Sequence, residues 1–183
     1  RFTSRALCGS VRRHAGSILA SVNSAGMPSS NLVQRLPAQP GLVVDGLGPI
    51  SLPLTDAQAE QLVSVCELAP HGRGTRTILD TSVRHTFQLA PGRMRFTNPA
   101  WEPALEETVA DAAEALGLKR DAVRCRLYKL LLYEEGCFFK PHMDTEKEPG
   151  MFATLSVQLP SVFSGGRVLV RHNEKTCSYA LGA

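Results

Sequence analysis

The sequence predicts an α+β protein in which two helices precede a run of antiparallel strands. Apolar residues recur at helical spacing after Thr55 and again after Asn98, whereas from Val123 onward apolar and polar residues alternate with a period of two. Helices that come before strands, rather than between them, favour an α+β fold over a parallel α/β sheet. We expect the chemistry in the strand half, because the two helices carry only packing residues.

Length and composition indicate an ordinary globular domain. The 183 residues suffice for one substantial core, and 43% hydrophobic and 20% charged residues are typical values. No apolar run approaches the ~20 residues of a membrane-spanning helix. The net charge of +3 is concentrated at one end, because the first 44 residues contain five Arg and no acidic residue. We therefore expect neither a nucleic-acid partner nor a membrane partner.

The five cysteines predict the redox compartment. They are widely spaced, odd in number and form no C-x-x-C pair, which indicates reduced thiols in an intracellular protein. The predicted location is cytoplasmic or nuclear. The basic, acid-free N-terminus leaves an organellar location open.

Residues 1–40 are predicted to lie outside the folded domain. Between Leu7 and Val22 apolar residues fall at helical spacing with arginines among them, as in an organelle transit peptide. A disordered tail, or part of an upstream region, is the alternative. Residues 21–40 are rich in Gly, Pro and Ser and indicate a linker. The domain is predicted to span residues 41–183, with helical support over 41–120 and a β core over 121–183.

The helical part is bounded by recognisable signals. Short strands are expected at 42–44 and 50–52. Thr55 and Gln58 form a capping-box pattern for a helix that ends at Pro70, and its apolar face comprises Ala59, Leu62, Val63 and Cys66. Residues 71–74 are interpreted as a plain loop, since the phosphate-loop pattern is absent. Residues 77–89 are predicted to form β structure. Within them, Arg84 and His85 are interpreted as an exposed strand pair or, alternatively, as a substrate contact. A second helix opens at Asn98 and ends at Gly117, with an apolar stripe of Trp101, Leu105, Val109, Ala112 and Leu116.

The β part carries the candidate chemistry. Residues 123–133 predict a buried strand, Glu135 and Gly136 a turn, and 151–159 a strand whose polar face includes Thr154. Gly165 and Gly166 predict a turn before a strand at 167–172. His142 and Asp144 lie between these strands, and residues i and i+2 of an extended chain point to the same side. An imidazole and a carboxylate placed in this way can bind one divalent iron, manganese or zinc ion.

His-x-Asp alone is a frequent surface pattern, so the flanking residues decide the interpretation. The segment L-L-L-Y-E-E-G-x-x-F-x-P-H-x-D-T at 130–145, with A-T-L-S-V-Q-L at 153–159 and the glycine pair at 165–166, resembles the iron- and 2-oxoglutarate-dependent dioxygenases. Within them it is most similar to the prolyl 4-hydroxylase-like branch. The resemblance implies a double-stranded β-helix (jelly-roll) with His142 and Asp144 as two of three iron ligands. It further implies that Tyr133 contacts 2-oxoglutarate and that Thr154 lines the same pocket.

The resemblance also implies an activity. Fe(II) is the expected metal, 2-oxoglutarate the cosubstrate and ascorbate a further candidate cofactor. The expected reaction is hydroxylation of a peptidyl (prolyl-type) substrate, or of a small molecule, with release of succinate and CO₂. A second ligand histidine and a Lys or Arg that anchors 2-oxoglutarate are expected beyond Ala183, so the chain is interpreted as a fragment truncated within the β-helix. His172, the last histidine, is interpreted as a strand-end surface residue, with the third ligand as the less favoured alternative.

Other interpretations remain at this point. Tyr133 is equally a core aromatic residue, and Cys137 is better explained as a buried structural thiol than as a sulfur ligand. The chain as a whole is alternatively a truncated, inactive β-helix that acts as a binding or interaction module. An iron-independent cupin-like binder is disfavoured by the segments around His142. The sequence predicts no oligomeric state.

Overall fold

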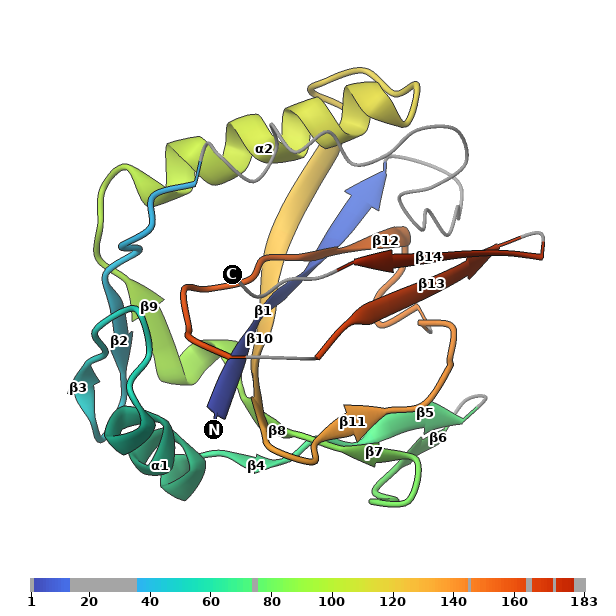
Figure 1. The fold of residues 1–183 in the computed structure, drawn as a ribbon. Coiled ribbons are helices and arrows are strands. Elements are labelled where there is room, and N and C mark those ends of the chain that lie inside the picture. The colour runs from blue at the N-terminus through green and yellow to red at the C-terminus, as the bar shows by residue number, and fades with distance from the viewer. Residues whose placement is uncertain are drawn as a thin grey trace.

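A five-stranded antiparallel sheet forms the centre of the computed structural model, which describes residues 2–13, 36–73, 76–144, 146–163, 166–172 and 174–179. The strand order is β12-β1-β10-β8-β4. Strands β1 and β10 run side by side through the middle of the fold (Figure 1). The five strands are β1 (Phe2–Arg13), β4 (Glu67–Leu68), β8 (Phe87–Leu89), β10 (Val123–Glu134) and β12 (Met151–Ser156).

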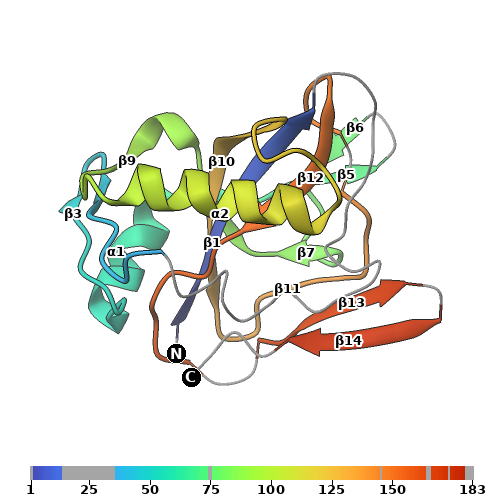
Figure 2. The same ribbon diagram turned by 90° about the horizontal axis from the view of Figure 1, so that it is seen from above.

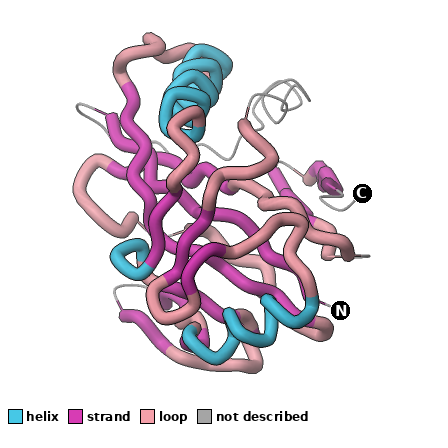
Figure 3. Tube along the Cα trace, turned by 90° about the vertical axis from the view of Figure 1, so that its left-hand side faces the viewer, coloured by secondary structure: helices cyan, strands magenta, loops and turns pink. Residues whose placement is uncertain are grey.

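Smaller sheets surround the central one. Two-stranded antiparallel sheets pair β5 with β6, β7 with β11 and β13 with β14, and a three-stranded sheet has the order β3-β2-β9. In Figure 3, strands and loops fill most of the trace and helical turns lie at its edges. The predicted α+β class is confirmed. The bounds are β2 (Leu42–Val44), β3 (Gly48–Pro49), β5 (His71–Arg73), β6 (Arg76–Ile78), β7 (Arg84–His85), β9 (Met94–Phe96), β11 (Phe138–Phe139), β13 (Val168–His172) and β14 (Lys175–Tyr179).

Helix α1 (Asp56–Val65) begins as the sequence predicts and ends earlier. Thr55 is the N-cap, and its hydroxyl oxygen accepts a hydrogen bond from the Gln58 backbone N–H at 3.3 Å. The helix ends at Val65 instead of Pro70, because residues 67–68 leave the helix to form strand β4 against β8. Ala59 and Leu62 are its buried residues.

Helix α2 (Trp101–Ala115) has the predicted signals at both ends. The Asn98 side-chain oxygen accepts from the Ala100 N–H at 2.9 Å, and Gly117 adopts a positive φ of 72°. The Leu118 N–H reaches back to the Ala113 carbonyl at 2.9 Å, which completes a Schellman motif. Seen from above, α2 crosses over β10 and β1 (Figure 2).

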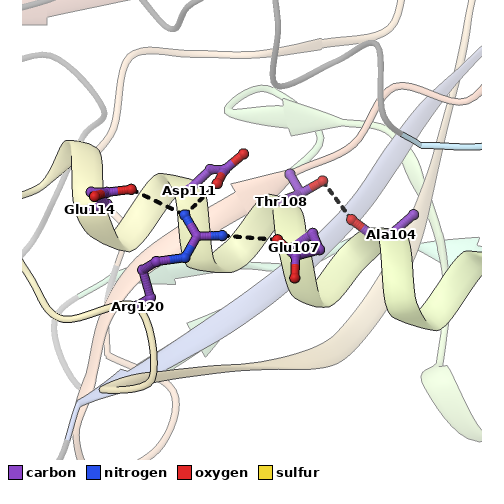
Figure 4. A network of polar contacts seen from close by, with 6 residues as sticks. All are labelled: Ala104, Glu107, Thr108, Asp111, Glu114 and Arg120. Atoms are coloured by element: carbon purple, nitrogen blue, oxygen red, sulfur yellow. Dashed lines mark hydrogen bonds and ion pairs between the residues drawn. The ribbon is translucent and has the colours of Figure 1, made fainter.

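The loop after α2 is fixed to the helix by Arg120. Its guanidinium lies 2.6 Å from Asp111, 2.8 Å from Glu107 and 3.0 Å from Glu114, three carboxylates on one face of the helix (Figure 4). The hydrogen bonds to Asp111 and Glu114 raise the pKa of Arg120. This network orients the chain as it enters β10.

Two apolar clusters hold the helices against the sheet. The larger packs α1 and the start of α2 on β2, β8 and β10. Within it, Trp101 is 2% exposed and stacks on Phe96 with ring centroids 5.0 Å apart, as expected for a core residue. The smaller cluster joins the far half of α2 to β10 and β12 through Val109, Ala113, Val123 and Phe152. Neither α-helix of the described chain is long and apolar enough to cross a membrane.

Strand β10 keeps one face toward these clusters along its whole length. Val123, Cys125 and Leu127 pack on that side in its first half, and Leu130 and Leu132 do so in the second. The change from odd to even positions coincides with irregular register against β1 between Lys129 and Leu127. A bulge of this kind shifts the alternation by one residue.

The N-terminal segment differs from the sequence-based expectation. Helical spacing predicted a transit-like helix or a disordered tail, whereas residues 2–13 form β1, paired with β10 on one side and β12 on the other. Both neighbours would otherwise present an open edge of backbone N–H and C=O groups, and pairing satisfies those groups. Residues 14–35 lie outside the described part of the chain.

Two strand predictions also need correction, and a third is confirmed. Residues 50–52 are not a strand, because the chain turns through Gly46 and pairs Gly48 and Pro49 with β2. Strand β12 ends at Ser156, although Val157 and Leu159 remain buried beyond it. Strand β13 does follow Gly166, and it forms an unpredicted hairpin with β14. Gly165 lies outside the described residues.

Candidate functional site

The candidate site lies on the loop that joins β11 to β12 (Figure 1). Strand β11 pairs with β7, so that Phe139 lies opposite Arg84 and Phe138 opposite His85. The Lys140 N–H continues this ladder by donating to the Val83 carbonyl at 3.0 Å. Backbone hydrogen bonds therefore fix the main chain as far as Lys140, two residues before His142.

His142 and Asp144 are brought together as predicted. Nε2 of His142 lies 3.4 Å from Oδ1 of Asp144. The other ring nitrogen, Nδ1, lies 2.8 Å from the Lys140 carbonyl oxygen, which can only accept a hydrogen bond. Nδ1 therefore carries a proton, and Nε2 either donates to the carboxylate, when the ring is protonated, or presents a lone pair beside it, when the ring is neutral. Both side chains reach the surface, with exposed fractions of 39% and 46%.

Asp144 is held as a carboxylate. Its hydrogen bond with His142 is the largest effect that lowers its pKa below the usual value, and partial burial opposes this shift. A hydrogen bond from Thr154, on β12, lowers the pKa further, as does the nearby charge of Lys147. The predicted pocket residue Thr154 thus reaches the site through Asp144.

An aromatic stack supports His142 from the other side. The imidazole lies on the Phe139 ring with centroids 3.5 Å apart and an interplanar angle of 19°. The Arg84 guanidinium lies over the same phenyl ring, 4.5 Å from its centroid. Arg84 is only 6% exposed, so the expectation of an exposed strand pair at residues 84–85 is wrong for this residue.

Tyr133, the predicted 2-oxoglutarate contact, lies in the second half of β10. It lies in β10 opposite Thr3 of β1 and is half-buried. Because Leu132 points into the main core, Tyr133 points to the opposite face of the sheet. Its contact with 2-oxoglutarate stays a prediction.

Cys137 behaves as a structural thiol. It is half-buried, with Sγ 3.8 Å from Nδ1 of His85, and burial is the main cause that raises its pKa. A protonated thiol is a poor metal ligand. His172 is the last residue of strand β13 and pairs with Lys175 of β14. The structure does not describe its side chain, so the prediction that it lies at the surface stays a prediction.

The pair does not extend to a complete metal site within the described residues. No group of three His, Cys, Asp or Glu side chains in that part of the chain is placed to hold one ion. His142 and Asp144 can therefore supply two ligands, and the third ligand and the basic anchor stay predictions.

The sequence predicted that His142 and Asp144 lie together and that Thr154 lies near them, but it did not predict the stack. Phe139 precedes His142 by three residues, which is a signal the sequence offered. Arg84 lies far away in the chain, and only the β7–β11 pairing brings it to the site. The Lys140 carbonyl that fixes the imidazole carries no signal in the sequence.

No protein-family model, curated protein or solved structure matches this chain. The function is therefore inferred from His142, Asp144 and the residues around them.

Proposed function

We propose that this chain is an iron- and 2-oxoglutarate-dependent dioxygenase built on a double-stranded β-helix. The proposal rests on the orientation of the His142 ring. Its Nδ1–H donates to the Lys140 carbonyl, which leaves Nε2 facing the Asp144 carboxylate. Histidines that bind metals typically donate their second ring N–H to a carbonyl or carboxylate in this way. The resemblance around residues 130–159 supplies the reaction class.

The separation of the two atoms suits a shared cation. Strong charge-assisted hydrogen bonds are about 2.7–2.9 Å long, shorter than the 3.4 Å between Nε2 and Oδ1. Two ligand atoms that each lie about 2.1 Å from one ion are roughly 3.0 Å apart at a right angle and roughly 3.4 Å apart at the tetrahedral angle. The donor set of one imidazole and one carboxylate fits Fe(II), and also Mn(II) or Zn(II).

The residues of the chain have distinct parts in the proposed reaction. His142 and Asp144 hold the ion, and the hydrogen bond from Thr154 orients the Asp144 carboxylate and helps to lower its pKa. Tyr133 is the proposed contact for 2-oxoglutarate. When bound, iron supplies the oxidising chemistry, in which 2-oxoglutarate, O₂ and a C–H substrate give succinate, CO₂ and the hydroxylated product. Ascorbate is the proposed reductant that keeps iron in the divalent state.

The openness of the site favours a peptidyl substrate over a small molecule. His142 and Asp144 are 39% and 46% exposed, so a segment of polypeptide can approach them. Met143, between them, is 84% exposed and offers a flexible apolar contact. We propose a protein or peptide substrate, of which a prolyl residue is one case.

A second candidate is a catalytically inactive β-helix that acts as an interaction module. The observation that favours it is that only two ligands converge within the described residues. This alternative predicts no metal-dependent turnover and no loss of partner binding when His142 is replaced.

The test is anaerobic loading with Fe(II), followed by addition of O₂ and 2-oxoglutarate and quantification of succinate. We expect iron-dependent succinate from the full-length wild-type protein and a loss of at least about tenfold when His142→Ala or Asp144→Ala is introduced into it. Asp121→Asn, which removes an exposed carboxylate from the loop before β10, is the matched control and should retain turnover. Equal succinate in all four proteins would contradict the proposal and favour the interaction module.

A further inference from the structure

We propose that Phe139 and Arg84 are positioning residues that set the orientation of the His142 imidazole for metal binding. The proposal rests on the proposed function, since it concerns the same ligand. It assigns a role to a stack of three side chains, Arg84, Phe139 and His142, that spans two strands and the loop beyond them.

The base of this stack is fixed to the fold. Arg84 and Phe139 are direct partners in the β7–β11 ladder, so their side chains leave the sheet on the same face. The Arg84 Nη1 donates to the Pro70 carbonyl at 3.0 Å, and the residue is 6% exposed. A guanidinium is planar and offers a rigid surface against which a ring can lie.

The phenyl ring is enclosed between two planar groups. The Arg84 guanidinium lies over it at 4.5 Å, and the His142 imidazole is nearly parallel to it at 3.5 Å. One face of a phenyl ring has room for only one such group, so the two occupy opposite faces. Arg84 therefore limits the movement of the Phe139 ring on one side. Any movement of the ring would shift the His142 imidazole that is stacked on its other side.

Two contacts then determine the orientation of the His142 imidazole ring. Stacking on Phe139 sets the tilt of its plane, and the hydrogen bond from Nδ1 to the Lys140 carbonyl sets the rotation within that plane. Together they aim Nε2 at Oδ1 of Asp144. His142 is 39% exposed, so without the stack its side chain would be free to occupy other rotamers, and each binding event would have to restore the productive one.

Burial of a cation at this place supports a role beyond packing. A buried guanidinium is costly unless hydrogen bonds and stacking compensate it, and an apolar side chain would fill the same space more cheaply. Its planar face and its charge suit it to hold an aromatic ring in place.

Cobalt(II) titration, followed by visible absorption, tests the proposal without any turnover. Phe139→Leu keeps the apolar volume but removes the planar ring, and we expect the dissociation constant to rise by about tenfold or more. Phe139→Tyr keeps the ring and should stay within about threefold of the wild type. Phe96→Leu, which breaks the stack on Trp101 in the core, is the matched control: it should lower Tm and leave the dissociation constant unchanged.

A second readout follows the histidine itself. In the metal-free protein the Phe139 ring current should shift the His142 ring protons upfield in the NMR spectrum, and Phe139→Leu should remove that shift. Arg84→Met, with Arg84→Lys as the milder variant, should reduce the shift while Phe139 remains present. A ring-proton shift unchanged by both Arg84 variants would overturn the role of Arg84.

The outcomes separate this inference from the proposed function. If His142→Ala binds cobalt as tightly as the wild type, there is no metal site at His142, and both proposals fail. If His142→Ala loses the metal while Phe139→Leu retains wild-type affinity, the metal site stands and the positioning role is overturned.

Discussion

The hydroxyl of Thr154, on strand β12, hydrogen-bonds the carboxylate of Asp144, which lies in the loop after β11. This bond ties the loop after β11 to the edge strand of the central sheet. A ligand carboxylate that is itself hydrogen-bonded keeps its orientation, and such outer partners commonly contribute a factor of 10 to 100 in metal affinity.

Replacing Thr154 by Val should weaken metal binding. The substitution keeps the branched shape but removes the hydroxyl, so Asp144 loses one of the bonds that orient it. We expect the dissociation constant for Mn(II) or Co(II), measured by calorimetry, to rise about tenfold. Thr154→Ser retains the hydroxyl and should stay near the wild type. A Val variant with unchanged affinity would mean that the bond has no part in the site.

Asp144 should also make the stability of the folded protein depend on pH in the acid range. Its pKa is lowered in the folded protein, so its ionised form stabilises the fold above the ordinary value of 3.8, and this contribution is lost as the pH falls through the folded pKa. The Tm difference between the wild type and Asp144→Asn, measured in EDTA, should therefore be largest near neutral pH and shrink toward pH 3. A difference that grows in acid would contradict the assigned shift.

The cysteines should differ in reactivity by position. Burial raises the pKa of Cys66 and of Cys125 to about 11, two units above the ordinary 9.0, so the thiolate population at pH 8 is about 100-fold smaller. Cys177 is exposed. Iodoacetamide labelling followed by peptide mass spectrometry should modify Cys177 first and Cys66 and Cys125 slowly. In urea the three should react alike, and rapid native labelling of Cys66 would contradict its burial.

Thr86 should anchor β10 next to Tyr133. Its side chain is 0% exposed, and its hydroxyl donates to the Leu132 carbonyl at 2.9 Å. Thr86→Val should lower the free energy of unfolding by about 1–3 kcal/mol, because a buried polar partner is lost. Thr77→Val, at an exposed position of β6, is the control and should change it by less than about 0.5 kcal/mol. Urea denaturation measures both, and equal effects would contradict the anchoring role.

Local signals in the sequence predicted the elements whose causes are local. The Thr55 cap, the Gly117 turn and the strand from Val123 onward depend on residues close in the chain, and each is present. The pairing of His142 with Asp144 was predictable for the same reason, because the two are separated by one residue.

Features that depend on distant pairing were not predictable. Residues 2–13 have no strong strand pattern, and they form β1 because β10 and β12 offer open edges on both sides. Arg84 reads as an exposed strand residue until β7 pairs with β11 and brings it over Phe139. Single-residue propensities contain no information about such long-range partners.

The proposed metal site is tested most directly by the stoichiometry of anaerobic Fe(II) binding, measured by equilibrium dialysis on the wild type, His142→Ala and Asp144→Ala. We expect one iron per wild-type chain and none retained by either variant at the same free iron concentration. Iron bound equally by all three proteins, or by none of them at any concentration that keeps the wild type folded, would contradict a metal site at His142 and Asp144.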